Sequence, residues 1–241
     1  GLSMLVTTSQ VVAFVFARGG SKGLPRKNIL PISGIPLLGH SIRSAQSVPQ
    51  VNQVFVSTDS EEIALVAEEF NATVIQRPPE LATDQASEWL AWQHAIRHVK
   101  ANYGTFDCFL SLPATAPLRS SQDIQLCLDG LKPGVDAVLT MTPSNRSPWF
   151  NMVCSGDGGF LHLVNCEAGP QVIRRQDAPQ CFDLTTVAYA IRPDFILSSN
   201  SFWDGSVVGV EIPPERAIDI DTPLDFAVAR FLMEEWVPAQ G

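Results

Sequence analysis

The stretch VVAFVFARGGSKGLPRKN, residues 11–28, decides the fold expected of this chain. Its first six residues are a continuous apolar run, which is typical of a strand buried on both faces of a sheet. The loop that follows holds three glycines and four of the chain's sixteen lysine and arginine residues, namely Gly19, Gly20, Gly23, Arg18, Lys22, Arg26 and Lys27. Glycines allow close backbone approach to a ligand, and clustered cations suit a polyphosphate. The stretch therefore predicts a phosphate-binding loop, with a flexible basic loop that binds nothing as the alternative.

The spacing of this loop excludes two familiar nucleotide-binding motifs. It contains neither the GxxxxGK[ST] pattern of the P-loop nor the GxGxxG pattern of the dinucleotide fold. Its position after a first buried strand still predicts a ligand at the carboxyl edge of an open α/β sheet.

Apolar runs alternate with helical patterns along the rest of the chain, which favours a largely parallel sheet with helices on both faces. The expected strands are residues 11–16, 54–56, 73–75, 109–112, 137–141, 187–191 and 217–221. The expected helices are residues 37–47, 61–70, 87–101, 121–131 and 223–236. Ser60, Ser120 or Ser121, and Thr222 are expected to cap three of these helices.

The whole chain sets further limits. Its 241 residues, 45% hydrophobic and 17% charged, predict one α/β domain over residues 1–241. The net charge of −9 disfavours nucleic acid and anionic membranes as partners. No run of ~20 apolar residues and no signal peptide is recognisable, and the five cysteines form no CxxC pair. We therefore expect a cytoplasmic protein without a membrane span, with reduced thiols.

Residues 143–180 interrupt the regular alternation with eight glycines and prolines. Such a segment cannot form one long helix and suggests a hairpin-bearing insertion. Trp149, Phe150 and Phe160 supply apolar surface for packing on a second subunit, and a plain surface loop is the alternative.

The segment Ile218-Asp219-Ile220-Asp221 alternates apolar and acidic residues. On a strand, both carboxylates would lie on one face, where they repel each other unless a cation lies between them. Mg²⁺ prefers such oxygen ligands, whereas a solvent-facing edge strand is the alternative. Together with the glycine loop, the pair suggests metal-assisted nucleotidyl transfer.

These motifs resemble the acylneuraminate cytidylyltransferases, also called CMP-sialic acid synthetases. The matching blocks are ARGGSKGLP (17–25) with Lys27 and Asn28, VSTD (56–59), RP (77–78) with ELA (80–82) and Asp84, PLR (117–119), RQ (175–176) and IDIDT (218–222). The resemblance implies a three-layer Rossmann-like nucleotidyltransferase fold that works as a homodimer, with the 143–180 insertion reaching the partner. It also implies transfer of CMP from CTP to the anomeric hydroxyl of a sialic-acid-like nonulosonic acid, with release of pyrophosphate.

The resemblance also implies roles for individual residues. The catalytic residues would be Arg18, Lys22, Asp219 and Asp221, with Mg²⁺ on the two aspartates. The nucleotide would contact Arg18, Gly19, Gly20, Ser21, Lys22, Lys27, Asn28, Arg77, Ala86 and Ser87. The acceptor sugar would lie near Arg175 and Gln176. No side chain stands out as a general base.

Two segments depart from the family pattern. Enzymes that act on N-acetylneuraminate often carry Gln before Pro-Thr-Ser-Pro-Leu-Arg, where this chain has PATAP (113–117). A segment usually like Phe-Arg-Pro-Asn-Gly is FDLTT (182–186) here. Both lie where the family touches the sugar, so they leave the acceptor open among legionaminate, pseudaminate and other nonulosonates. Kdo, another sugar, or a catalytically silent binding role remain the alternatives.

Overall fold

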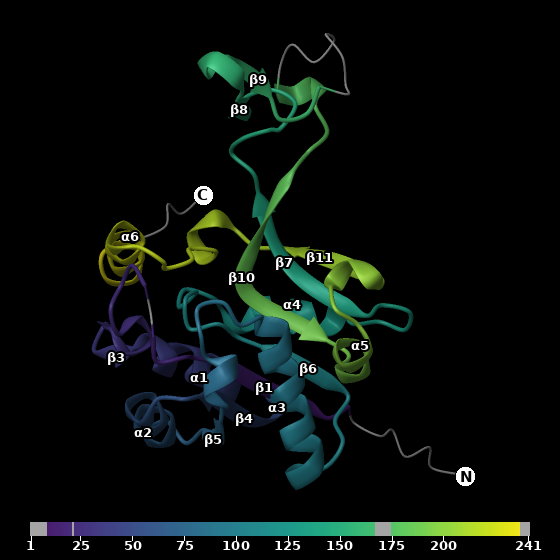
Figure 1. The fold of residues 1–241 in the computed structure, drawn as a ribbon. Helices are drawn as coiled ribbons and strands as arrows, with labels where there is room; N and C mark the ends of the chain where they lie inside the picture. The colour runs from purple at the N-terminus through teal and green to yellow at the C-terminus, as the bar shows by residue number, and fades with distance from the viewer. Residues whose placement is uncertain (1–8, 21, 167–174, 237–241) are drawn as a thin grey trace.

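The computed structural model describes residues 9–20, 22–166 and 175–236, and within them seven strands form one sheet in the order β11-β7-β10-β6-β1-β4-β5 (Figure 1). The strands are β1 (Val11–Phe16), β4 (Val51–Thr58), β5 (Thr73–Gln76), β6 (Cys108–Ser111), β7 (Ala137–Pro143), β10 (Phe182–Ile191) and β11 (Val207–Glu211). Among these described strands, β10 alone is antiparallel to its neighbours. The predicted mostly parallel sheet is confirmed.

Helices cover both faces of the sheet, because successive side chains of β1 point alternately to the two faces and are buried on both. The helices are α1 (Leu37–Gln46), α2 (Glu61–Glu69), α3 (Glu88–Tyr103), α4 (Ser121–Gly130), α5 (Pro193–Ser198) and α6 (Pro223–Glu234). Val11, Ala13 and Val15 belong to one core, which α1, α2, α4 and α6 complete. Val12 and Phe14 belong to the other, which α3 and α5 complete. In the described part of the chain, no helix is both long and apolar enough to cross a bilayer.

The predicted helix caps are confirmed in detail. Ser60 Oγ accepts from the Ile63 N–H at 3.3 Å, and Ser120 forms a capping box with Asp123. Thr222 forms a second capping box with Asp225, and Pro223 occupies the first helical position. Each cap satisfies first-turn N–H groups that otherwise lack a partner.

The predicted strand over residues 217–221 is wrong. All five residues are described, and they form an extended segment after the 3₁₀ turn Pro214–Arg216 rather than part of the sheet. The Ile220 N–H donates to the Thr115 carbonyl at 2.8 Å, and the Ile220 side chain is fully buried. Alternate residues of this segment are buried, as in a strand, although the segment forms no hydrogen-bonded ladder with the sheet. The edge strand is instead β11, which the sequence reading missed.

An arm projects from the sheet between β7 and β10 (Figure 1). It carries the antiparallel hairpin of β8 (Val153–Ser155) and β9 (Leu161–Leu163), whose turn places Gly158 at a φ of 68°. The hairpin predicted within residues 143–180 is thus present. A smaller hairpin, β2 (Pro31–Ile32) with β3 (Ile35–Pro36), follows the glycine loop.

One buried arginine connects three elements beneath the carboxyl edge of the sheet. Arg119 donates from Nε to the Val187 carbonyl of β10 at 2.6 Å and from Nη1 to Ser41 Oγ of α1 at 2.7 Å. Its Nη2 donates to the Pro113 carbonyl, which follows β6. Burial lowers the pKa of Arg119 to about 9. The guanidinium thereby fixes the segment after β6 relative to β10.

We expect Arg119→Met to lower the free energy of unfolding by about 3 kcal/mol, because it removes the buried guanidinium that donates to the Val187 carbonyl and to Ser41 Oγ. Urea unfolding followed by circular dichroism measures the change. Arg97→Met, at an exposed position of α3, is the matched control and should leave stability within about 0.5 kcal/mol of the parent protein. Equal effects of the two substitutions would contradict the role given to Arg119.

Candidate active site

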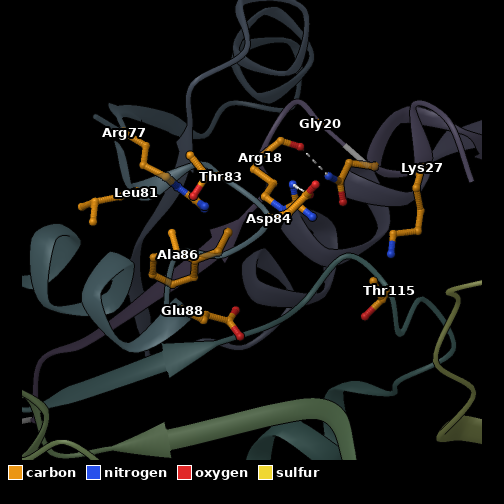
Figure 2. A pocket seen from close by; sticks show the side chains of 12 residues that line it. Arg18, Gly20, Lys27, Arg77, Leu81, Thr83, Asp84, Ala86, Glu88 and Thr115 are labelled. Carbon is orange, nitrogen blue, oxygen red and sulfur yellow. Dashed lines mark hydrogen bonds and ion pairs between the residues drawn. The ribbon is translucent and has the colours of Figure 1, made fainter. Parts of the chain in front are cut away.

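A cavity of about 250 Å³ opens at the carboxyl edge of the parallel strands (Figure 2). Its walls come from the segments that follow β1, β5 and β6 and from the start of α3. The lining residues are Phe16, Arg18, Gly20, Lys27, Asn28, Arg77, Leu81, Thr83, Asp84, Ala86, Glu88 and Thr115. Residues far apart in the sequence therefore meet where open α/β sheets usually bind ligands.

The glycine loop forms one side of this cavity, as the sequence predicts. Arg18, Gly20, Lys27 and Asn28 line it, and Asn28 Nδ2 donates to the Arg18 carbonyl at 3.3 Å. The Gly19 N–H donates to Asp59 Oδ1 at 2.8 Å, which fixes the start of the loop. Ser21, also predicted to contact the nucleotide, lies outside the described residues.

Gly23 brings the loop against the acidic segment. Its φ of 84° is in the left-handed region, and a Cβ built there would lie 3.1 Å from the Asp221 carbonyl oxygen. A side chain at this position is disfavoured by both the backbone conformation and the close contact. The approach of residues 217–221 to the loop therefore depends on glycine at this position.

Two cations of the loop share one carboxylate. Arg18 Nη1 lies 2.5 Å from Asp84 Oδ1, and Lys22 Nζ lies 3.1 Å from Asp84 Oδ2. Their hydrogen bonds lower the pKa of Asp84, so this acid stays ionised. An incoming phosphate would compete with Asp84 for both cations. The sequence reading included Asp84 in the family resemblance but gave it no role.

Arg77 forms the opposite wall. It is 5% exposed, donates from Nε to Ser57 Oγ and from Nη2 to the Ser57 carbonyl, both at 3.1 Å, and lies over the Phe16 ring at 5.8 Å. Desolvation lowers its pKa, while attraction to Glu88 opposes that shift. Arg77, predicted to lie near the nucleotide, is thus one of the residues that line this cavity.

The start of α3 supplies the floor of the cavity. Of the two residues here that are predicted to contact the nucleotide, Ala86 lines the cavity, whereas Ser87 is the N-cap residue of α3 and does not belong to the described lining. Glu88, the next residue, does line it, and desolvation raises its pKa against the opposing attraction of Arg77. The sequence reading missed Glu88, because an acid in the first turn of a helix is common for helix stability alone.

Asp219 and Asp221 reach the same place without a strand. Asp221 Oδ1 lies 3.2 Å from Lys27 Nζ. Asp219 Oδ1 accepts from Thr186 Oγ1 at 3.1 Å, and Thr186 in turn accepts from Thr115, which lines the cavity, at 3.3 Å. Desolvation and the neighbouring Asp221 carboxylate both raise the pKa of Asp219. The charge of this pair is therefore incompletely balanced by the protein.

The carboxylates of Asp219 and Asp221 suit a hard divalent cation. Within the described residues, no group of three or more histidine, cysteine or acidic side chains gathers as a metal site. Two carboxylates beside a phosphate-sized cavity suit Mg²⁺, which usually keeps several waters and binds one or two carboxylates together with substrate phosphates.

The residues predicted to contact the acceptor lie elsewhere in the chain. Arg175 begins the 3₁₀ turn Arg175–Asp177, and Gln176 lines a second cavity of about 380 Å³ at the base of the arm, with Ser144, Arg146 and Cys181. Among the described residues, the two cavities share no lining residue. One chain alone therefore does not bring Gln176 to the first cavity.

Comparison with known proteins shows the family of this chain. The cytidylyltransferase family model matches residues 12–132, which include every described lining residue of the first cavity. A post-translational flagellin modification protein B of Campylobacter coli is 33% identical over 231 residues, which cover 94% of this chain and 96% of that protein. A CMP-N,N'-diacetyllegionaminic acid synthase of Campylobacter jejuni is 32% identical over 93% of this chain and 95% of its own length.

The fold comparison agrees. The solved structure of a CMP:2-keto-3-deoxy-manno-octonic acid synthetase complexed with CTP superposes with a TM-score of 0.70 at 20% identity, covering 93% of this chain and 98% of that one. This likeness confirms the Rossmann-like nucleotidyltransferase fold. With half of the chain matched by the family model and two relatives aligned over nearly their whole lengths, the chain belongs to the cytidylyltransferase family.

Proposed function

We propose that this protein transfers CMP from CTP to the anomeric hydroxyl of a sialic-acid-type nonulosonic acid and releases pyrophosphate. The observation that carries the proposal is the meeting of the glycine loop with the acidic pair, through Gly23 and through the ion pair of Lys27 with Asp221. The 32% identical legionaminic acid synthase supports a nonulosonic acid as the acceptor. The acceptor oxygen forms a bond to the α-phosphorus, the bond to the departing pyrophosphate breaks, and the hydroxyl proton passes to solvent.

The cations of the loop would hold the triphosphate. Arg18 and Lys22 already bind one carboxylate, that of Asp84, and phosphate oxygens would replace it as their partner. Lys27 lies between the cavity and Asp221, where it would stabilise negative charge on the departing pyrophosphate. Transfer of this kind depends mainly on such positioning and charge stabilisation.

Asp219 and Asp221 would hold Mg²⁺, which when bound supplies positive charge at the reacting phosphate. Thr186 fixes the orientation of Asp219 through its hydrogen bond, and Lys27 does the same for Asp221. Both carboxylates are then prepared for a cation before any substrate arrives.

The arm supports a homodimer. Its hairpin exposes large apolar side chains, with Phe160 79% and Leu161 66% exposed. A second copy of the chain that covers this surface would also bring the segment of Arg175 and Gln176, which belongs to the arm, to the partner's site.

All five cysteines lie in the described part as free thiols, which supports a cytoplasmic protein.

The reaction is tested by incubating the protein with CTP, Mg²⁺ and a panel of nonulosonic acids plus Kdo, and by measuring pyrophosphate release. We expect release with one or more nonulosonic acids and its loss when EDTA removes the metal. Release with Kdo alone would replace the proposed acceptor, and silence across the panel by the folded protein would overturn the proposal.

Asp221→Asn should lower the rate by about 10²–10³-fold, because it removes one of two charges opposite the metal. The matched control is Asp194→Asn. In the parent protein, Asp194 lies on α5 at the opposite edge of the sheet and pairs with Lys100 on the surface. The control should retain the parent rate. A rate for Asp221→Asn within a few-fold of the parent would argue against the acidic pair.

Phe160→Glu should convert the dimer to a monomer, because it places a charge in the proposed apolar contact. Size-exclusion chromatography with light scattering measures the mass. Phe231→Glu on α6, where the parent side chain is 49% exposed, is the control that should remain dimeric. A monomeric parent protein, or a dimeric Phe160→Glu variant, would contradict the assignment.

A further inference from the structure

The first cavity has two chemically different ends. Figure 2 shows Arg18, Gly20 and Asp84 close together with Lys27 beyond them, and we call these four residues the phosphate end. Arg77, Leu81, Ala86 and Glu88 lie at the other end, which with Phe16 we call the base end. The phosphate end suits a triphosphate, because Arg18 and Lys27 supply positive charge there.

The base end has the features of a site for a flat, polar ring. Phe16, Leu81 and Ala86 offer apolar surface, and Arg77 contributes a guanidinium held in place by Ser57. Glu88 lines the same end of the cavity as Arg77 (Figure 2) and adds a hydrogen-bond acceptor to this donor. A ring that carries an acceptor on one side and a donor on the other satisfies both.

Cytosine and uracil differ in this respect. Cytosine carries an exocyclic amine, a donor, at the position where uracil carries a carbonyl oxygen, an acceptor. A carboxylate accepts from the amine but repels the carbonyl. We propose that Glu88 accepts a hydrogen bond from the exocyclic amine of the base and thereby makes the site select CTP over UTP. The assignment rests on the proposed use of CTP and adds the residue that reads the base.

Two simpler roles for Glu88 need to be separated from this one. An acid at the first position of a helix stabilises the positive end of the helix dipole without any ligand. A carboxylate in a nucleotide site can also accept from ribose hydroxyls. Glu61 provides a control for the first role, because it is the first residue of α2, is exposed, and belongs to no described cavity lining near the site. The deoxy nucleotide dCTP provides a control for the second.

The experiment measures the dissociation constants of CTP, UTP and dCTP by isothermal titration calorimetry, with Mg²⁺ and without an acceptor. The proteins are the parent, Glu88→Gln, Glu88→Ala and the control Glu61→Gln. We expect the parent to prefer CTP to UTP, and both Glu88 variants to reduce that preference by about tenfold, since a good base contact contributes about 1–3 kcal/mol of discrimination. Glu61→Gln should keep the parent's preference. Two different substitutions at position 88, each checked by urea unfolding, separate a lost contact from a lost fold.

An unchanged CTP preference in folded Glu88 variants would overturn the assignment while leaving the proposed reaction intact. A loss confined to the preference for CTP over dCTP would also overturn it and place Glu88 at the ribose. If the parent protein binds no CTP, both the assignment and the proposed function are contradicted.

Discussion

Burial of β1 on both faces is the constraint on which the rest of the structure depends. Alternate residues of this strand enter two separate cores, so helices must cover the sheet on both sides. Because β4 and β6 run parallel to β1 on either side, the segments that follow these strands emerge at one edge. The ligand cavity forms there because polar residues placed just after each buried strand have no other region in which to meet.

Charge balance shapes this edge. The chain carries a net charge of −9, yet four cations lie within ten residues of its first loop. Each of these cations has an acidic partner outside the loop. Arg18 and Lys22 share Asp84, Arg26 pairs with Glu62, and Lys27 pairs with Asp221. The loop is therefore held in shape before a ligand arrives, and a polyphosphate would exchange one set of anionic partners for another. Because one set of ion pairs replaces another, the net gain in binding free energy is limited. The affinity for a polyphosphate then depends on how well the positions of the loop cations match those of its oxygens.

The antiparallel strand β10 connects the site with the arm. Thr185, Thr186 and Val187 lie where its pairing with β7 shifts register. Thr186 holds Asp219, and the Val187 carbonyl accepts from Arg119, which also fixes the segment carrying Thr115. The same strand begins beside the base of the arm, close to the second cavity. The position of the acidic pair and the direction of the arm thus depend on a single element.

The sequence by itself determined six of the seven described sheet strands, five of the six described α-helices, the caps at Ser60, Ser120 and Thr222, and the glycine loop, because each depends on residues close together in the chain. It also identified Asp219 and Asp221, although it assigned them wrongly to a strand, since burial of Ile220 against Thr115 produces the same alternation as a sheet. Only the tertiary structure decided that Asp84 pairs with Arg18 and Lys22, that Thr186 orients Asp219, and that Glu88 lines the same cavity as Arg77. These pairings join segments up to dozens of residues apart, and local pattern carries no information about which distant side chain will lie opposite.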